Sequence, residues 1–427
     1  MYKYEHSVQL DESKCTGCTT CLRHCPTEAI RIQNNRAVIN TQRCIDCGEC
    51  IRVCPHKAKK AVCGKLANMS RFKWKIALPA PTLYGQFDNL DDIDYVLNGL
   101  LKIGFDDVFE VSKAAELVSA YTRIYLKTDG IKKPAISSAC PVVTRLIGLR
   151  FPSLNDHIIH MLPPMEVAAG LAKQKAKEDH PEFSDEDIGV CFISPCAAKA
   201  SYVKNGFAKY KSRVDEVISI SDIYFSLIGE MRMGENIKPM IESGRIGIGW
   251  ARSGGEATAI FNSNYLAADG IDNVIDVLEQ VENGNIPPLD FIELNACTGG
   301  CVGGVLTIQN PFIAKARLQS LRKYLPVSQN QPSKNDLDYI PESYLFDELP
   351  EYQPMSRLSD SMAESMRMMA DIQNLKKILP GTDCGSCGAP TCRAFAEDVV
   401  RRLNKVDNCV ILKSRADKCE EDKNNDR

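Results

Sequence analysis

The chain has 427 residues, of which 25% are charged and 44% hydrophobic, and its formal net charge is −3. This length predicts roughly two to four domains, and the near-neutral charge excludes the strongly basic composition typical of nucleic-acid-binding proteins. No apolar run approaches the roughly 20 residues that span a bilayer, and the N-terminus lacks the apolar region of a signal peptide. We therefore expect a cytoplasmic protein with neither a nucleic-acid nor a membrane partner.

The nineteen cysteines divide the chain into three blocks. Disulfides are rare in the cytosol, so these thiols are expected to serve metals. The predicted domains are residues 1–72, 73–354 and 355–427. The first block also carries twelve Lys and Arg against six Asp and Glu, an excess of positive charge that would offset thiolate-bound clusters; a solvated basic face is the alternative.

The first block contains C-x2-C-x2-C-x3-C followed by proline twice, with an offset of 29 residues. Three closely spaced cysteines can bind one cubane while the fourth binds the other. One 4Fe-4S cluster is therefore expected on Cys15, Cys18, Cys21 and Cys54, and a second on Cys44, Cys47, Cys50 and Cys25. A zinc site is the alternative, but zinc spacings do not usually produce this doubled pattern. Residues 6–60 resemble bacterial two-cluster ferredoxins, which implies an α+β domain.

In the second block, strand-like runs alternate with helix-like stretches, which favours an α/β domain with largely parallel sheets. The predicted strands are Lys75–Pro79, Asp107–Val111, Ile188–Ile193, Ile246–Trp250 and Phe291–Leu294, and the predicted helices are Ile93–Ile103, Ala114–Leu126 and Pro164–Lys177. A polar, proline-punctuated linker is expected over 328–354. It leads into a predicted helix over 355–379, whose methionines are expected to fill a core.

Four cysteines of the second block lie near the ends of strand-like runs: Cys140, Cys196, Cys297 and Cys301. Ligands of open α/β sheets collect at the carboxyl ends of strands, so these thiolates could hold one buried cluster. The glycines that flank Cys301 would let the backbone approach the metal closely. Each cysteine alone is a weak signal, because a cysteine on an apolar strand is usually a small buried side chain; Cys191 is interpreted in that way.

The segments around Cys140, from Pro195 to Lys199 and from Glu293 to Gly304 resemble the three H-cluster motifs of the iron-only (FeFe) hydrogenases. The resemblance implies a two-lobed H-cluster domain, in which the four cysteines hold a cubane and Cys301 also bridges to a diiron subcluster. That subcluster carries CO, cyanide and an azadithiolate, and it is absent when the maturation proteins have not acted. Lys199 would donate a charge-assisted hydrogen bond to a cyanide ligand.

The implied reaction interconverts H2 with two protons and two electrons, with a redox partner such as ferredoxin. Ala139 stands where catalytic members carry the cysteine that passes protons, and Ser194 and Asn295 stand where methionines are usual. Turnover should therefore be slow or use another proton route. Glu256 and Glu293 are the candidates for that route; the alternative is that they cap helices or pair with lysines.

The third block predicts one more 4Fe-4S site in a small helical domain, on Cys384, Cys387, Cys392 and Cys409. It resembles the single-cubane domain of corrinoid iron-sulfur proteins, with zinc as the alternative. The expected cofactors are therefore three accessory 4Fe-4S clusters and one H-cluster. No role is assigned to Cys63, Cys191 or Cys419.

This architecture resembles the sensory-type branch of the hydrogenase family. No PAS-type sensory domain is visible, so a signalling partner would be a separate protein. A different class of function is an iron-sulfur assembly or scaffold protein of the Narf-like kind, which shares the fold and lacks the diiron subcluster. A pure electron-transfer module would leave the three central motifs unexplained.

Overall fold

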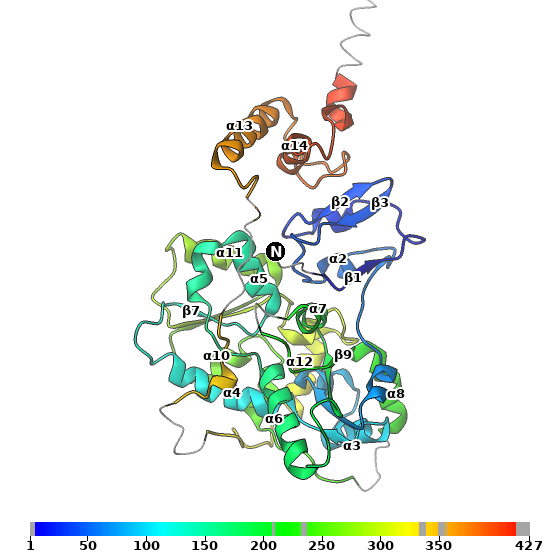
Figure 1. Ribbon diagram of the computed structural model, residues 1–427, viewed down its shortest axis with the longest axis vertical. Coiled ribbons are helices and arrows are strands. Elements are labelled where there is room, and N and C mark those ends of the chain that lie inside the picture. The colour runs from blue at the N-terminus through cyan, green and yellow to red at the C-terminus, as the bar shows by residue number, and fades with distance from the viewer. Residues whose placement is uncertain are drawn as a thin grey trace, which may run out of the picture.

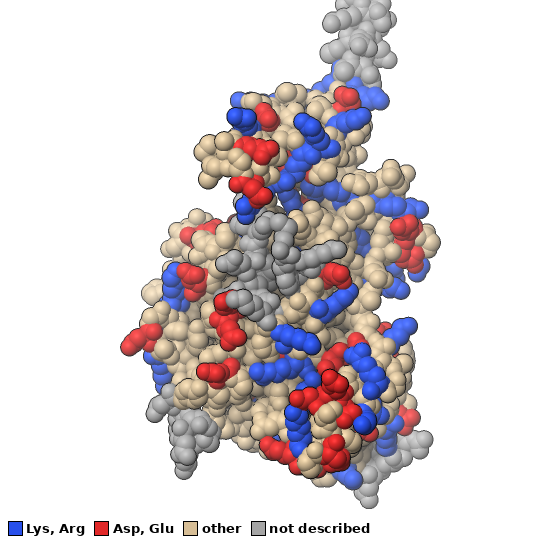
Figure 2. All heavy atoms as spheres, viewed as in Figure 1, with Lys and Arg blue, Asp and Glu red and all other residues tan. Residues whose placement is uncertain are grey.

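The structure is a computed structural model that describes residues 5–206, 210–231, 237–332, 339–348, 355 and 357–415. Figure 1 shows the N-terminal strands between a larger central body and a helical C-terminal body, which contains α13 (Met362–Ile378) and α14 (Cys392–Val400). Figure 2 shows acidic and basic side chains interspersed over one face of the molecule. Among the described residues, no helix combines the length and the apolar character needed to cross a membrane.

The N-terminal domain is built from two antiparallel strand pairs and two short helices. β1 pairs with β4 and β2 pairs with β3. The elements are β1 (Val8–Leu10), α1 (Thr20–Arg23), β2 (Ile30–Gln33), β3 (Arg36–Ile39), α2 (Glu49–Arg52) and β4 (Lys59–Ala61). The 29-residue sequence repeat thus becomes a structural repeat, and the predicted α+β fold of this domain is confirmed. The 3-10 helix η1 (Leu66–Arg71) connects it to the central domain.

The central domain contains two parallel sheets, as predicted for a two-lobed α/β fold. One sheet has the strand order β6-β5-β8-β9 and the other β10-β11-β7. The strands are β5 (Trp74–Pro79), β6 (Asp107–Val108), β7 (Ala135–Ile136), β8 (Ile188–Ser194), β9 (Glu216–Ser219), β10 (Tyr265–Asp269) and β11 (Phe291–Asn295).

Helices cover both faces of the four-stranded sheet. Successive residues of β8 alternate between two hydrophobic clusters, so that Phe192 packs on one face while Cys191 and Ile193 pack on the other. A parallel sheet buried on both faces requires such continuously apolar strands. The helices of the whole central domain are α3 (Asp94–Lys102), α4 (Val111–Tyr125), α5 (Pro141–Arg150), α6 (Pro164–Asp179), α7 (Ala197–Asn205), α8 (Ile220–Glu230), α9 (Arg245–Gly249), α10 (Gly255–Ala259), α11 (Ile271–Glu282) and α12 (Pro311–Leu321). The 3-10 helices of this domain are η2 (Pro81–Gln86), η3 (Pro152–His157), η4 (Cys301–Gly303) and η6 (Glu342–Tyr344), while η7 (Val406–Asn408) follows α14 in the C-terminal body.

The strand predicted over Ile246–Trp250 is wrong, because this segment belongs to helix α9. Its alternating glycines serve close packing instead of a strand. A Cβ added at Gly247 would lie 2.1 Å from the carbonyl oxygen of Ser112 on α4. The carboxylate of Glu116, also on α4, accepts hydrogen bonds from the backbone N–H groups of Gly244 (2.8 Å) and Gly247 (3.4 Å), which supplies acceptors for the start of the helix.

Three further expectations need correction. The strand predicted over Asp107–Val111 ends at Val108, since Val111 already begins α4. The helix predicted over 355–379 starts only at Met362, where the hydroxyl of Ser361 caps it by accepting from the N–H of Glu364. Its methionines are not core filling, because Met362 is 74% exposed and Met366 is 66% exposed. Residues 333–338 and 349–354 of the predicted linker lie outside the described residues.

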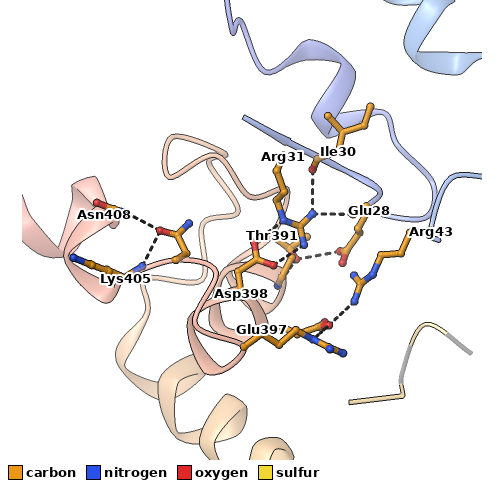
Figure 3. A network of polar contacts seen from close by, with 12 residues as sticks. Glu28, Ile30, Arg31, Arg43, Thr391, Glu397, Asp398, Lys405 and Asn408 are labelled. Carbon is orange, nitrogen blue, oxygen red and sulfur yellow. Dashed lines mark hydrogen bonds and ion pairs between the residues drawn. The ribbon is translucent and has the colours of Figure 1, made fainter. Parts of the chain in front are cut away.

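The C-terminal domain is attached to the N-terminal domain by two ion pairs that are largely shielded from solvent (Figure 3). The guanidinium of Arg31 donates to both carboxylate oxygens of Asp398, at 2.5 and 3.1 Å, and Arg43 pairs with Glu397. A backbone hydrogen bond from Ile32 N–H to the carbonyl of Gly388 (2.9 Å) lies in the same interface. Bidentate Arg–carboxylate pairs fix geometry as well as contribute energy.

We predict that Asp398→Ala loosens this interface, because it leaves the largely buried Arg31 without its anion. Losing a hydrogen-bonded charge costs about 2 kcal/mol, and hydrogen exchange of the Ile32 amide should accelerate roughly 30-fold. Asp360→Asn is the control, since Asp360 is 90% exposed in its pair with Arg357 and such pairs contribute little. Equal exchange in the two variants would show that the Arg31 pair does not hold the domains together.

Candidate iron-sulfur and catalytic sites

The four central cysteines line one cavity. Cys140 precedes α5 and Cys196 precedes α7, while Cys297 and Cys301 follow β11. The strands before these helices belong to different sheets, so the cavity lies where the carboxyl ends of both parallel sheets meet. The side chains of Lys199, Glu256 and Glu293 line the same cavity, together with Ala139 and Asn295.

Glycines around Cys301 allow the ligand loops to pack against each other. A Cβ added at Gly304 would lie 2.1 Å from the carbonyl oxygen of Pro195, the residue before Cys196. A Cβ at Gly300 would lie 2.4 Å from the backbone nitrogen of Ser253. Any larger side chain would push these loops apart, so the glycines hold Cys301 close to the Cys196 loop.

Burial makes the thiols of Cys196, Cys297 and Cys301 hard to ionise in the absence of metal. It raises the pKa of Cys196 to about 12 and also raises the pKa values of Cys297 and Cys301. The ammonium of Lys199 opposes this effect at Cys196 and Cys301. Thiolates are the metal-binding form, so metal binding at this site must displace protons.

Lys199 lies in the first turn of α7, three residues after Cys196. Its Nζ is 5.3 Å from the centre of the Phe192 ring, an arrangement that steadies the cation beside an aromatic face. The structure therefore places Lys199 at the cavity wall, where sequence reasoning expected a donor toward a bound anion.

The two carboxyl groups have different partners. Glu293, on β11, accepts hydrogen bonds from the N–H groups of Gly254 (3.0 Å) and Ala257 (2.8 Å) and from the amide of Asn295 (2.7 Å). These donors favour an ionised carboxylate, although burial raises the pKa of Glu293. Glu293 thus caps the start of α10, as the alternative interpretation of this residue had it.

Glu256 has a hydroxyl partner instead, with 2.6 Å between its Oε2 and Ser137 Oγ. Burial, followed by the charge of Glu293, raises the pKa of Glu256 to about 8. A carboxyl with this pKa carries a proton at neutral pH. Of the two candidates, Glu256 is therefore the one equipped to hold and release a proton.

Sequence reasoning missed Ser137, which links Glu256 to the first cysteine loop. Ser137 Oγ also accepts a hydrogen bond from the backbone N–H of Ala139 at 3.2 Å. Ser194 accepts from the N–H of Cys196 at 3.0 Å and is absent from the cavity lining. Serines just before cysteine ligands carry no distinctive spacing, so only the position of Ser137 after a strand-like run hinted at this role.

The eight N-terminal cysteines separate into the two predicted sets. We name the two cavities by their position relative to the central cavity. The outer cavity is lined by Cys15, Cys18, Cys21 and Cys54, and the inner cavity by Cys25, Cys44, Cys47 and Cys50. A third small cavity is lined by Cys384, Cys387, Cys392 and Cys409. In each of the three cavities the structure brings together four cysteines that the sequence grouped. Four thiolates are the usual ligand set of a 4Fe-4S cluster, and cluster binding at these sites stays a prediction.

Within the described residues, no three Cys, His, Asp or Glu side chains converge tightly enough to hold a single metal ion. A four-iron cluster does not need that convergence, because each thiolate binds a different iron. The described cysteines are free of disulfides. Cys191 is fully buried in the sheet core and Cys63 lines none of these cavities, while Cys419 lies outside the described residues.

Family models match all three parts of the chain. The model described as "Iron only hydrogenase large subunit, C-terminal domain" matches residues 73–262 and 252–305, together more than half of the chain. A "4Fe-4S dicluster domain" matches residues 7–55, and a model for an Fe-S cluster domain matches residues 379–411.

A curated relative is the periplasmic Fe hydrogenase large subunit of Nitratidesulfovibrio vulgaris strain Hildenborough. It is 30% identical over 213 residues, which cover 45% of this chain and 50% of the relative, so the match spans half of the relative's length. Solved structures of the FeFe-hydrogenase HydA1 from Chlamydomonas reinhardtii align with a TM-score of 0.47 at 15% identity, covering 64% of this chain and 91% of theirs. A structure of HydA that describes stepwise H-cluster assembly has the same TM-score, identity and coverage.

The raised pKa of Glu256 predicts a carboxylic acid that is protonated below about pH 8 and ionised above it. Infrared spectroscopy over a pH titration should show its C=O stretch at pH 6 to 7, fading as the pH rises, and Glu256→Gln should remove it. Glu293→Gln should lower the transition pH, because it removes the neighbouring negative charge. A spectrum without this band at pH 6 would contradict the assignment.

Proposed function

Because the chain belongs to the iron-only hydrogenase family, we propose that it interconverts H2 with two protons and two electrons, slowly and in a sensory role. The observation that carries this proposal is the convergence of Cys140, Cys196, Cys297 and Cys301 on one cavity beside Lys199. The replacement of the proton-passing cysteine by Ala139 is the reason for slow turnover.

The chain's own residues account for binding and charge at the central cavity. The four thiolates, that of Cys301 included, would hold the H-cluster. An H-cluster bound there would supply the redox-active iron for H2 chemistry. Lys199 supplies a cation for an anionic ligand, and the apolar walls from Ala80, Phe192 and Trp250 keep water away.

Glu256 is the proposed proton carrier in place of the missing thiol. Its carboxyl lines the cavity and its proton is available near neutral pH. Ser137 joins the Glu256 carboxyl to the loop that carries Ala139 and Cys140. Glu293 acts through Glu256, since its negative charge keeps the neighbouring carboxyl protonated.

Electrons are proposed to travel through the accessory sites. The inner cavity borders the central one: Arg52 donates to the carbonyl of Gly303 at 3.0 Å, and Ser201 of α7 donates to Asp46 at 2.7 Å. Arg23 donates to the carbonyl of Cys384 at 2.8 Å, which joins the N-terminal domain to the C-terminal site. A redox partner such as ferredoxin would exchange electrons with this chain of sites. A separate signalling partner would carry any signal output. We also propose a cytoplasmic location, in which thiols stay reduced, and dependence on hydrogenase maturation proteins.

We predict that the matured protein contains a diiron subcluster. Protein matured in vitro, or reconstituted with a synthetic diiron complex, should show infrared bands of CO and cyanide. Lys199→Met should shift the cyanide bands, because a charge-assisted donor is lost. Persistent absence of these bands in competently matured protein would overturn the proposal and favour the iron-sulfur assembly or scaffold function.

Ala139→Cys should raise H2 turnover by at least about tenfold, because it restores an acid–base group at the cavity wall. Glu256→Gln should abolish most of the residual activity of the parent chain while affecting the Ala139→Cys variant less. The measurement is H2 production and uptake by matured protein, with equal CO and cyanide band intensities as the loading control. Unchanged turnover after Glu256→Gln in the parent chain would reject Glu256 as the proton carrier. Unchanged turnover after Ala139→Cys would show that the missing thiol does not limit the reaction.

A further inference from the structure

The two N-terminal cavities are built from the same repeat and can be compared residue by residue. An offset of 29 relates Cys25 to Cys54 and Ala29 to Ala58. In both halves the alanine N–H donates to the cysteine sulfur, at 3.2 Å for Ala29 and 3.3 Å for Ala58. Because the backbone environments match, a difference in charge between related positions stands out.

The first such difference is Lys59, whose counterpart in the repeat is Ile30. Each lines its own cavity, and both are buried: Ile30 is 2% exposed and Lys59 is 4% exposed. The Nζ atom of Lys59 has no nitrogen or oxygen partner among the described residues, and the group that lies beside it is the thiol of Cys21. Burying an ammonium costs free energy unless an anion lies beside it. The position of Lys59 therefore favours negative charge in the outer cavity.

The thiols around Lys59 respond to its charge. Burial raises the pKa of Cys21, and Lys59 is the main opposing influence. Burial also raises the pKa of Cys50, to about 12, and Lys59 again opposes it. Lys59 therefore lies close to one cysteine of each set, although it lines only the outer cavity.

The second difference is Asp46, whose counterpart is Gly17. Asp46 lines the inner cavity and is 2% exposed. Its carboxylate accepts hydrogen bonds from the N–H and Oγ of Ser7, both at 3.0 Å, and from Ser201 Oγ at 2.7 Å. These donors stabilise the anion. After burial, the charge of Asp46 is the next cause that raises the pKa of Cys44.

We propose that Lys59 and Asp46 set a reduction-potential difference between the two N-terminal clusters, with the outer cluster at the higher potential. Adding an electron makes a cluster more negative, so a nearby cation favours reduction and a nearby anion opposes it. At the inner cavity the influence of Asp46 offsets that of Lys59, whereas the outer cavity has Lys59 without an equivalent of Asp46.

The consequence for function rests on the proposed cluster assignment. One electron passing from the reduced inner cluster to the oxidised outer cluster moves to the higher potential. The outer cavity includes Ile32, whose backbone N–H is bonded to Gly388 of the C-terminal domain. Electrons released at the central site would therefore collect next to the C-terminal domain, on the side away from the central cavity.

The test is a potentiometric titration of the full-length reconstituted protein, followed by electron paramagnetic resonance. Lys59→Met should raise the oxidised-to-reduced ratio of the outer cluster at least about tenfold at fixed potential, equivalent to about 59 mV. Asp46→Asn should change the ratio of the inner cluster in the opposite direction. The double variant should bring the two N-terminal midpoints together.

Lys60→Met and Glu12→Gln are the matched controls, because each removes one charge at an exposed position of the same domain. Exposed charges are screened by solvent, so both controls should titrate like the parent chain. Lys59→Ile copies the counterpart Ile30 and serves if Lys59→Met assembles poorly, and Lys59→Arg should keep the parent potentials.

Iron and sulfide contents distinguish a failure of the proposed cluster binding from a failure of the proposed potential difference. If the parent protein binds no clusters on the N-terminal cysteines, the proposed function fails at this domain. If all variants bind the parent amounts of iron and sulfide but the Lys59 and Asp46 variants titrate like the controls, the clusters stand and the assigned potential difference is wrong.

Discussion

Burial of cysteine sulfur is the constraint on which the rest of this structure depends. The central thiols lie where two parallel sheets end, and desolvation raises the pKa values of Cys196, Cys297 and Cys301. A buried thiolate is stable only when a cation compensates it, so the site is suited to thiolates bound to iron. The same desolvation acts on Cys44 and Cys47 of the inner cavity. Metal binding and folding are therefore expected to be thermodynamically linked in each domain.

The low polarity of the central cavity also explains why only one of its two carboxyl groups, Glu256 and Glu293, carries a proton. Two buried carboxylates side by side cannot both ionise at low cost. The three N–H donors around Glu293 stabilise its negative charge, and the proton then belongs to Glu256, whose serine partner can accept or donate. The protonation of Glu256 thus depends on Glu293 and on the N–H groups of Gly254 and Ala257 at the start of α10. These two residues are distant from the cysteines in the sequence.

The contacts between the three domains place the N-terminal cavities between the central cavity and the C-terminal cavity. Arg145 donates to the carbonyl of Cys44 at 2.7 Å and Arg52 to that of Gly303, so arginine side chains connect the central domain to the inner cavity. Arg23 and Arg31 make the corresponding contacts with the C-terminal domain. Some of the basic residues that exceed the acidic ones in residues 1–72 thus lie at domain interfaces, and Lys59 lies inside a cysteine-lined cavity. Others, such as Lys14, Lys57 and Lys60, are exposed to solvent.

The sequence by itself determined which cysteines group together, because short spacings leave the chain few ways to arrange three sulfurs around one centre. It also determined the parallel strands, because continuous apolar runs must be buried on both faces. It misassigned Ile246–Trp250, where alternating glycines serve contact with α4. Only the tertiary structure decided that Glu256 meets Ser137, that Glu293 caps α10, and that Lys59 and Asp46 lie in different cavities. These outcomes depend on burial and on partners far away in the chain, and neither can be read from local spacing.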